Sequence, residues 1–435
     1  MAKAFRMGGI HPPENKLSAG KSIEAFPLPE QAVFLLNQHL GAPAELLVKK
    51  GDKVKTGALI AKANGRISAN IHSSVSGTVL KIDDVTDAGG YHSPAVVIRT
   101  EGDEWEDVID RSATLVKTFD YSAEEIIRKV ADAGIVGLGG AAFPTHVKLA
   151  IPQGKKAEVL IVNGVECEPY LTADHALMLE KGEEILVGIR LLMKAIGVCR
   201  AVIGIEINKK DAIAHLGKLA QKYPEIEVCP LKVKYPQGSE KQLVDAILKR
   251  RIKSGMLPVD AGAVVQNVGT AFAVYEAVQK NKPLIEQVLT VTGETVTPTN
   301  FRVRIGVSTL SVIQAAGGLS ENTGKILHGG PMMGKAIADP ETPVTKRTNA
   351  VLIMPRRSSI RKEKQNCIRC ATCVSVCPMG LAPYLLMTAV EMGIVDVVKK
   401  ERIMDCIECG SCNFVCPANR PMLDYIRLGK KYYGK

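Results

Sequence analysis

The chain has 435 residues, of which 46% are hydrophobic and 23% charged, so it is long enough to form several domains, each with its own core. Aromatic residues make up only 4% and there is one Trp, which argues against a stacking platform for single-stranded nucleic acid. The formal net charge of +11 suits an acidic partner or an anionic surface better than a basic one.

Residues 1–120 are expected to be an N-terminal region that contains a small β domain. Within it, residues 46–82 alternate short β-rich runs with glycine turns. Their pattern V-x2-G-D-x-V-x2-G…S-x-V-S-G-T-V resembles the barrel-sandwich fold of biotinyl and lipoyl domains. Those domains carry a swinging arm on a lysine, and the corresponding residue here is Arg66, whose guanidinium cannot form the amide. We expect a barrel without an arm; an unrelated small β domain is the alternative.

Residues 121–285 change to alternating strands and amphipathic helices, which predicts a Rossmann-like α/β domain with a largely parallel sheet. Ligands of such sheets bind at the carboxyl ends of the strands, where free backbone N–H groups can hold phosphate. The most apolar stretch of the chain starts at Glu184 but contains Arg190, Lys194 and Arg200, too many charges for a bilayer span. It is expected to be an amphipathic helix followed by a buried strand.

A glycine-rich segment lies near the start of this domain, with the sequence GIVGLGGAAFPTHVK over residues 134–148. It places Gly137, Gly139 and Gly140 in a loop that can approach a ligand closely, and Lys148 on the helix expected after it. Such loops bind phosphate in some proteins and are ordinary turns in others, so the segment alone leaves both interpretations open.

Residues 286–345 return to β structure, with a strand pair, a crossing helix and a further strand, which suggests a small β-grasp domain of the SLBB type. The following residues 346–364 are polar and basic and are expected to be a linker. A solvated linker is one interpretation of their charge, and a docking surface for an acidic partner or anionic lipid is the other.

Residues 365–435 contain two copies of the run C-x2-C-x2-C-x3-C-P, which is the bacterial ferredoxin spacing for [4Fe–4S] clusters. Zinc ribbons would not use the third and fourth cysteine of each run, and a disulfide framework is unusual in a long chain without a secretory signal. Because the fourth cysteine of each run binds the other cluster, two ligand sets are predicted. These are Cys367, Cys370, Cys373 and Cys416, and Cys406, Cys409, Cys412 and Cys377. The isolated Cys167, Cys199 and Cys229 are expected to be small buried hydrophobic residues.

Four motifs in order resemble the FMN- and NADH-binding subunit of respiratory complex I. The glycine loop ending in FPTHVK resembles its flavin loop, and VNGVECEPY, YPQGSEKQL and NVGT resemble three further motifs of that family. With the opening FRMGGIHPPENK, the barrel and the cysteine runs, the whole chain resembles the C subunit of the Rnf complexes, which are ion-pumping ferredoxin:NAD oxidoreductases of bacterial membranes.

The resemblance implies a multidomain α/β electron-transfer subunit with FMN, two [4Fe–4S] clusters and NAD(H) as substrate. It would lie peripherally on the cytoplasmic side of the inner membrane, with integral membrane and cluster-carrying subunits and ferredoxin as partners and Na⁺ or H⁺ translocated by the complex. By motif, the residues implied to bind the flavin and nicotinamide are Gly137, Gly139, Gly140, Lys148, Asn163, Glu166, Gly238, Ser239, Glu240, Asn267 and Thr270.

Two alternative functions are open at this point. Cobalamin reductases share the same domain plan and would reduce a corrinoid. A relay subunit that binds clusters but no FMN is the second, because Val165 and Ser239 stand where the complex I family has acidic residues. His11 and the loop HGGPMMG at residues 328–334 receive no role.

Overall fold

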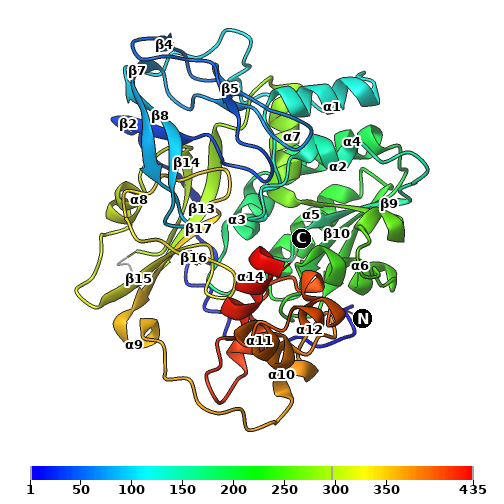
Figure 1. The fold of residues 1–435 in the computed structure, drawn as a ribbon. Coiled ribbons are helices and arrows are strands. Elements are labelled where there is room, and N and C mark those ends of the chain that lie inside the picture. The colour runs from blue at the N-terminus through cyan, green and yellow to red at the C-terminus, as the bar shows by residue number, and fades with distance from the viewer. Residues whose placement is uncertain (1, 295–296, 434–435) are drawn as a thin grey trace.

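The computed structural model describes residues 2–294 and 297–433. They form a β-barrel, an α/β domain, a β-grasp domain and a C-terminal helical module, which pack against one another (Figure 1). In Figure 1 the barrel lies at the upper left in blue, the α/β domain at the right in green, and the orange and red helical module at the bottom. The domains expected over 1–120, 286–345 and 365–435 include residues 1, 295–296 and 434–435, which lie outside the described residues.

The barrel consists of two small sheets with the strand orders β2-β8-β7-β4 and β3-β5-β6. Phe34, Ile60 and Ile98 are fully buried in its core, because alternate residues of each strand face inward. Arg66 is exposed in the loop between β5 and β6. The strands are β2 (Gln31–Leu35), β3 (Glu45–Leu46), β4 (Lys53–Val54), β5 (Leu59–Lys62), β6 (Ile71–His72), β7 (Gly77–Thr86) and β8 (His92–Thr100).

The α/β domain contains a parallel sheet in the order β11-β10-β9-β12. Its register pairs Asn163 at the end of β9 with Asn267 at the end of β12, so both mark the carboxyl edge where such sheets bind ligands. The strands are β9 (Val159–Asn163), β10 (Ala201–Glu206), β11 (Ile226–Leu231) and β12 (Ala263–Asn267). The helices are α1 (Ala123–Asp132), α2 (Thr145–Leu149), α3 (Ala173–Glu180), α4 (Gly182–Ile196), α5 (Lys210–Ala220), α6 (Glu240–Leu248), η1 (Pro258–Ala261) and α7 (Val268–Gln279).

The apolar stretch that starts at Glu184 forms α4 and then β10, which confirms the expected helix and buried strand. All positions of β10 are buried, as is typical of a strand covered on both faces. Within residues 2–294 and 297–433, no helix has the length and hydrophobicity that crossing a bilayer requires.

The β-grasp domain contains a sheet in the order β1-β14-β13-β17-β15-β16, with α8 packed on it. Its edge strand β1 comes from the N-terminal region and pairs in parallel with β14, so the expected N-terminal region contributes to two modules. The elements are β1 (Ile23–Ala25), β13 (Glu286–Gly293), β14 (Thr299–Arg304), α8 (Thr309–Ala315), β15 (Thr323–His328), β16 (Lys335–Ala336) and β17 (Ala350–Pro355).

The expected linker over residues 346–364 is wrong in its first half. Strand β17 lies in the middle of the sheet between β13 and β15, with its first four residues buried. Lys346 is also buried, and its Nζ donates to the carbonyls of Asn70 in the barrel and Gly134 in the α/β domain, both at 2.7 Å. Burial lowers the pKa of Lys346 to about 7. The basic character of the segment concealed an apolar strand, and only residues after Pro355 are mostly exposed.

The C-terminal module is a compact set of short helices around the two cysteine runs. Leu386, Val398 and Ile426 form its core together with Cys377. The elements are α10 (Thr372–Ser375), α11 (Pro383–Glu391), α12 (Val395–Lys400), η2 (Ile403–Asp405), α13 (Ser411–Phe414) and α14 (Met422–Tyr433). The short helix α9 (Arg356–Ser359) precedes the module and contacts β15 and β17 of the β-grasp sheet.

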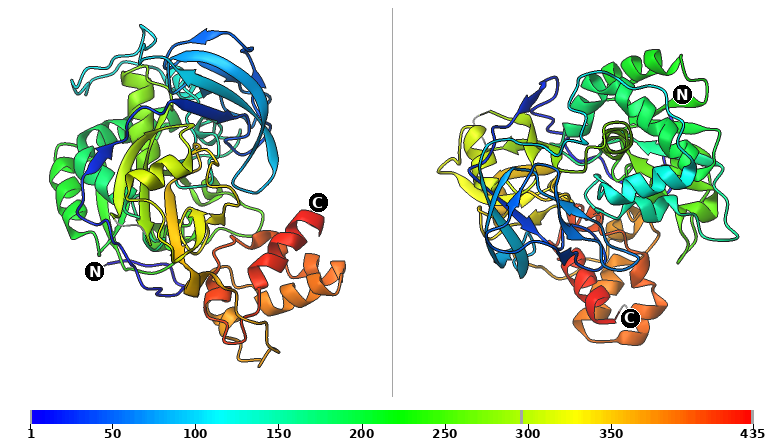
Figure 2. Two further views of the ribbon diagram at one scale, coloured as in Figure 1. Left: turned by 90° about the vertical axis from the view of Figure 1, so that its left-hand side faces the viewer. Right: turned by 90° about the horizontal axis from the view of Figure 1, so that it is seen from above.

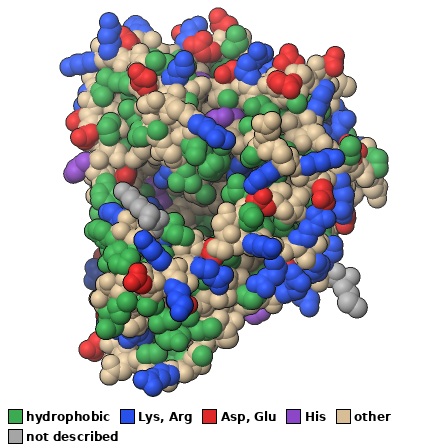
Figure 3. Space-filling view, turned by 45° about the vertical axis from the view of Figure 1, so that its right-hand side comes forward, with side chains coloured by type: hydrophobic (Ala, Val, Ile, Leu, Met, Phe, Trp, Pro, Cys, Tyr) green, Lys and Arg blue, Asp and Glu red, His purple; other side chains and the backbone are tan. Residues whose placement is uncertain are grey.

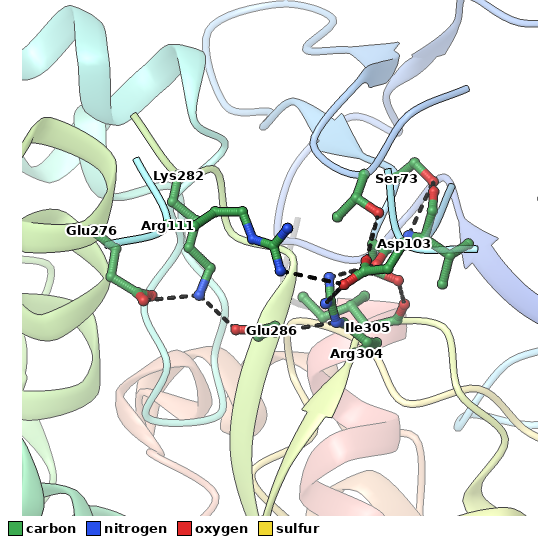
Figure 4. A network of polar contacts seen from close by, with 11 residues as sticks. Ser73, Asp103, Arg111, Glu276, Lys282, Glu286, Arg304 and Ile305 are labelled. Carbon is green, nitrogen blue, oxygen red and sulfur yellow. Dashed lines mark hydrogen bonds and ion pairs between the residues drawn. The ribbon is translucent and has the colours of Figure 1, made fainter. Parts of the chain in front are cut away.

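A half-buried network of charges joins the three larger modules (Figure 4). Lys282 donates to Glu276 on α7 at 2.9 Å and to Glu286 on β13 at 2.5 Å. Arg304 on β14 pairs with Glu286 at 3.1 Å and with Asp103, which follows the last barrel strand, at 3.3 Å. The chain of ion pairs therefore runs from the α/β domain through the β-grasp domain into the barrel.

The protonation of this network favours the folded state at neutral pH. Burial opposes the ionised form of Glu286, but Lys282 and Arg304 outweigh it and keep the pKa of Glu286 below its usual value. Burial likewise opposes the charged form of Lys282, but Glu276 and Glu286 raise its pKa. The carboxylate therefore stabilises the fold above its unfolded pKa of about 4.3, and the lysine does so below its unfolded pKa of about 10.4.

The substitution Glu286→Gln should lower the free energy of unfolding by about 3 kcal/mol, because it leaves Lys282 and Arg304 buried with too little negative charge. Denaturant unfolding can be followed by the fluorescence of Trp105, whose ring centroid lies 4.7 Å from the Arg304 guanidinium. Glu104→Gln is the control, since Glu104 pairs with Lys55 on the surface and should change stability by less than about 1 kcal/mol. Equal losses in the two variants would contradict the prediction.

Candidate cofactor sites

A cavity of about 840 Å³ lies at the carboxyl ends of β9 and β12, between the α/β domain and its neighbours. This volume is within the range of small-molecule and cofactor sites. It is lined by all but one of the residues that the sequence motifs indicate, namely Gly137, Gly139, Gly140, Lys148, Asn163, Glu166, Gly238, Ser239, Glu240 and Asn267. The exception is Thr270, which supports the wall from behind.

The glycine loop between α1 and α2 forms one wall of the cavity. Within this loop, the Gly137 N–H donates to the Phe143 carbonyl at 2.9 Å. The Leu138 N–H donates to the hydroxyl of Thr270 on α7 at 2.9 Å, which ties the loop to a helix far along the chain. Gly140 has a φ of +102°, a conformation that favours glycine. The loop is thus a constrained structure and not a loose turn.

Lys148 on α2 and Glu240 on α6 form an ion pair at the side of the cavity. Lys148 also lies 3.4 Å from the carbonyl oxygen of Val265 on β12. The lysine charge therefore faces the cavity beside the strand ends, with Glu240 as its partner.

The two strand-end asparagines hold the surrounding loops in place. Asn163 donates from Nδ2 to the Gly238 carbonyl at 2.8 Å. Asn267 caps α7, with Oδ1 accepting from the Gly269 N–H at 2.8 Å, and donates from Nδ2 to Asp174 at 2.7 Å. Both side chains are thus committed to positioning the cavity walls.

Two half-buried acids, Glu166 and Asp174, meet at the cavity. The Asp174 N–H donates to Oε1 of Glu166 at 2.7 Å, while Oε2 of Glu166 is buried without a protein partner. Burial, followed by the charge of Glu166, raises the pKa of Asp174 well above its usual range. Asp174 therefore holds a proton more readily than an exposed aspartate would.

Lys16 holds the backbone that carries these acids. Its Nζ donates to the carbonyls of Glu166, Glu168 and Leu171 at 2.9, 2.9 and 2.7 Å. Glu166 has a φ of +46°, which a non-glycine residue adopts only at a cost. Lys16 belongs to the opening motif of the chain, so that motif has a structural role at the cavity.

The loop at residues 328–334, which received no role from the sequence, closes one side of the cavity. The N–H groups of Met332 and Met333 donate to Oε1 of Glu168 at 2.6 and 3.0 Å. A side chain on Gly330 would collide with Glu168, since its Cβ would lie 2.1 Å from the Glu168 Cγ. The loop can approach Glu168 this closely because Gly330 has no side chain. In the sequence, the pair of glycines at 329 and 330 was the feature that pointed to this contact. His11 is exposed and takes no part in the cavity.

The structure brings the fourth cysteine of each run next to the three of the other run. Besides burial, the thiolates of Cys416, Cys367 and Cys370 raise the pKa of Cys373. Burial, and the neighbouring Cys409 and Cys377 thiolates, raise the pKa of Cys406 to about 11. We call Cys377, Cys406, Cys409 and Cys412 the inner set, and Cys367, Cys370, Cys373 and Cys416 the outer set.

The inner set lies next to the cavity and the outer set at the surface. Ile407 and Glu408, between two cysteines of the inner set, line the cavity. The hydroxyl of Tyr235, another lining residue, donates to the Cys409 carbonyl at 2.8 Å. In the outer set, Cys367 and Cys370 are exposed. Tyr235 was missed by the sequence analysis because its partner is far away along the chain.

The isolated cysteines differ from the expectation of buried hydrophobic residues in two cases. Cys229 is buried, as expected, but Cys199 is exposed just after α4. Cys167 is half-buried and lines the cavity, where its Sγ accepts from the Gly238 N–H at 3.3 Å.

Four protein families match successive parts of the chain. Residues 4–103 match the family described as RnfC barrel sandwich hybrid domain and residues 130–276 the Nuo51 FMN-binding domain. Residues 288–336 match the SLBB domain and residues 366–420 the 4Fe-4S dicluster domain. The matches confirm the expected fold class, including the barrel, and the expected FMN and iron–sulfur cofactors.

Relatives match over nearly the full chain. The C subunit of the proton-translocating ferredoxin:NAD(+) oxidoreductase complex of Clostridium ljungdahlii is 44% identical over 98% of this chain and 93% of the relative. The C subunit of the Na(+)-translocating complex of Acetobacterium woodii is also 44% identical, over 98% and 96%. The C subunit of the ion-translocating oxidoreductase complex of Rhodobacter capsulatus is 42% identical over 97% and 82%.

Among solved structures, an NAD+-reducing [NiFe]-hydrogenase in the H2-reduced state has a chain with a TM-score of 0.51 and 18% identity. The match covers 72% of this chain and 62% of that chain and shows a shared fold. The assignment to a family rests on the relatives that match over nearly the full chain. The chain belongs to the family of the C subunits of ion-translocating ferredoxin:NAD(+) oxidoreductase complexes, and it carries that family's barrel-sandwich, FMN-binding, SLBB and dicluster domains.

Proposed function

We propose that this chain exchanges electrons between NAD(H) and the other subunits of its complex, through FMN in the cavity and clusters in the two cysteine sets. The observation that carries the proposal is the shared wall between the cavity and the inner set, formed by Tyr235, Ile407 and Glu408. A flavin site and a cluster site that touch in this way suit direct electron exchange. The full-length similarity to C subunits of such complexes favours this function over a cobalamin reductase or a relay without flavin.

The residues of the cavity fit FMN. The glycine loop presents backbone at close range, Lys148 supplies a positive charge for phosphate, and the unpaired polar atoms Glu166 Oε2 and Gln266 Nε2 can bond to a polar ring. Gly137, Gly139, Gly140 and Lys148 would hold the phosphate and its chain, and Asn163, Glu166, Gly238, Ser239, Glu240, Asn267 and Thr270 would shape the remainder. Bound FMN exchanges hydride with a nicotinamide and single electrons with iron–sulfur clusters.

The cysteine sets fit clusters in a defined order from the cavity. All eight cysteines are free thiols, which is the donor type that [4Fe–4S] clusters need. The Leu381 and Glu408 N–H groups lie 3.4 Å from Cys377 Sγ and Cys406 Sγ, and such hydrogen bonds raise a cluster's reduction potential. The inner set would exchange electrons with the cavity, and the outer set with a partner.

The surface beside the outer set suits an acidic redox partner. Residues 361–371 are all exposed, and the side chains of Arg357, Lys362 and Arg369 have no ion-pair partner among the described residues. Ile368 is 67% exposed between Cys367 and Arg369, which gives the charged strip an apolar centre. Lys and Arg side chains are frequent on the face shown in Figure 3. The partner would be a cluster-carrying subunit or ferredoxin at the cytoplasmic face of the bacterial inner membrane.

Anaerobic addition of NADH to the protein reconstituted with iron, sulfide and FMN should bleach both the flavin and the iron–sulfur absorbance. Removal of an outer ligand by Cys370→Ala should leave the flavin and the inner cluster reducible, as measured by electron paramagnetic resonance. Removal of an inner ligand by Cys409→Ala should leave the outer cluster oxidised. Flavin that NADH leaves oxidised in the unmodified protein would overturn the proposed function, and reduction of the outer cluster in Cys409→Ala would overturn the order.

The substitution Thr270→Val should weaken FMN binding about tenfold, because the Leu138 N–H loses its acceptor and the glycine loop its anchor. The dissociation constant can be measured by titrating the apoprotein with FMN and following flavin fluorescence. Thr292→Val is a matched control, since the buried hydroxyl of Thr292 has no partner to lose. Equal affinity of Thr270→Val and the unmodified protein would show that the loop does not depend on this bond.

Replacing Arg357, Lys362 and Arg369 together by Gln should slow association with membranes that carry the other subunits about tenfold at low salt and flatten its dependence on ionic strength. This association can be measured as the rate of NADH-driven electron transfer into those membranes at several salt concentrations. The matched control replaces Lys49, Lys50 and Lys53 by Gln at the opposite end of the molecule, near β4 (Figure 1). A control variant that slows association as much as the test variant would exclude the strip as the docking site.

A further inference from the structure

The mouth of the cavity is formed by parts of the molecule outside the α/β domain. The turn between β7 and β8 contributes Asp87, Ala88, Gly89 and Tyr91, and helix α14 contributes Arg427. The two elements approach each other, with the Lys431 ammonium 5.7 Å from the centroid of the Tyr91 ring. Figure 2 shows the barrel hairpin reaching down toward the red C-terminal helix. The barrel and the helical module thus face each other across the entrance.

Tyr91 is an exposed aromatic ring on an ordered backbone. Oδ1 of Asp87 accepts from the N–H groups of Gly89 and Tyr91 at 2.7 and 3.1 Å, and the Asp87 N–H donates to the Tyr91 carbonyl at 2.8 Å. Tyr91 nevertheless is 65% exposed. The other described aromatic residues that line the cavity, Phe143, Tyr235 and Phe272, are buried or half-buried. An aromatic ring that is largely exposed and stands on an ordered backbone offers a stacking surface for a flat base.

Positive charge lies beside this ring on α14. Arg427 and Lys431 are four residues apart, so they share one face of the helix. Glu408 pairs with Arg427 at 3.0 Å, but it also pairs with Lys430 at 2.8 Å, so one carboxylate is shared between two cations. Cationic groups therefore exceed acidic ones on this side of the mouth, which favours an anionic ligand.

We propose that the adenosine diphosphate half of NAD(H) binds at this mouth, with the adenine stacked on Tyr91 and the pyrophosphate near Arg427 and Lys431. The inference rests on the proposed function, because it assumes that the nicotinamide half enters the cavity. It assigns part of the substrate site to the barrel and the dicluster module, neither of which contains the flavin loop. The barrel, although it has no arm, then has a role in substrate binding.

The test measures binding to the oxidised holoprotein by calorimetry, with no turnover. ADP-ribose carries the half of the dinucleotide that should contact Tyr91, and nicotinamide mononucleotide carries the other half. Tyr91→Ala should weaken ADP-ribose binding about tenfold and leave nicotinamide mononucleotide binding unchanged. Tyr91→Phe should retain the affinity, because the ring remains. Arg427→Gln should weaken ADP-ribose binding and reduce its dependence on salt.

Two controls match the variants. Tyr432→Ala removes a tyrosine that is 64% exposed on α14 but does not line the cavity, and Arg361→Gln removes an arginine that pairs with Asp424 on the same helix. Both should bind ADP-ribose normally. Unchanged ADP-ribose affinity in Tyr91→Ala would overturn this inference alone. Absence of binding of either compound to the unmodified protein, with flavin that NADH does not reduce, would overturn the proposed function as well.

Discussion

The arrangement of this molecule depends on one half-buried chain of opposite charges, from Glu276 through Lys282 and Glu286 to Arg304 and Asp103. Charges inside a protein are costly unless each has partners in the right place, so the network tolerates only one relative position of the three modules that supply it. Electron exchange needs such a fixed arrangement, because the cavity wall is assembled from all four modules. Lys346 adds a second tie, from the β-grasp domain to the barrel and the α/β domain.

The parts of the fold that local sequence patterns determine were predictable. The spacing of the cysteines indicated clusters, and the glycine loop with its later motifs indicated residues that line one cavity. Contacts between distant segments were not predictable, because the local sequence of one segment does not indicate which other segment it will contact. The pairing of β1 with β14, the bond from Tyr235 to Cys409 and the docking of residues 328–334 on Glu168 are of this kind. Strand β17 was concealed for a different reason, since its hydrophobic run is short and basic residues flank it on both sides.

The proposed function divides its tasks among the modules. The α/β domain supplies the flavin loop and the half-buried acids, the β-grasp loop completes the wall, and the helical module brings the inner set of cysteines to the same cavity. The opening segment also belongs to this assembly, since Lys16 holds the loop of Glu166 and the Gly9 N–H donates to the carbonyl of Val376 beside the cysteines at 2.8 Å. Substrate site and electron outlet are thus separate surfaces connected by buried groups.

The position of β17 has a consequence for how this chain could have been assembled in evolution. The strand that precedes the helical module lies between β13 and β15, and after Pro355 the short helix α9 and the exposed residues 360–371 lead to the module. A recombination event that joined a ferredoxin-like module to a flavoprotein would have had to preserve this strand, and only a crossover after Pro355 leaves the sheet intact. Exchange of the module between lineages is therefore expected to have occurred at that residue or beyond it.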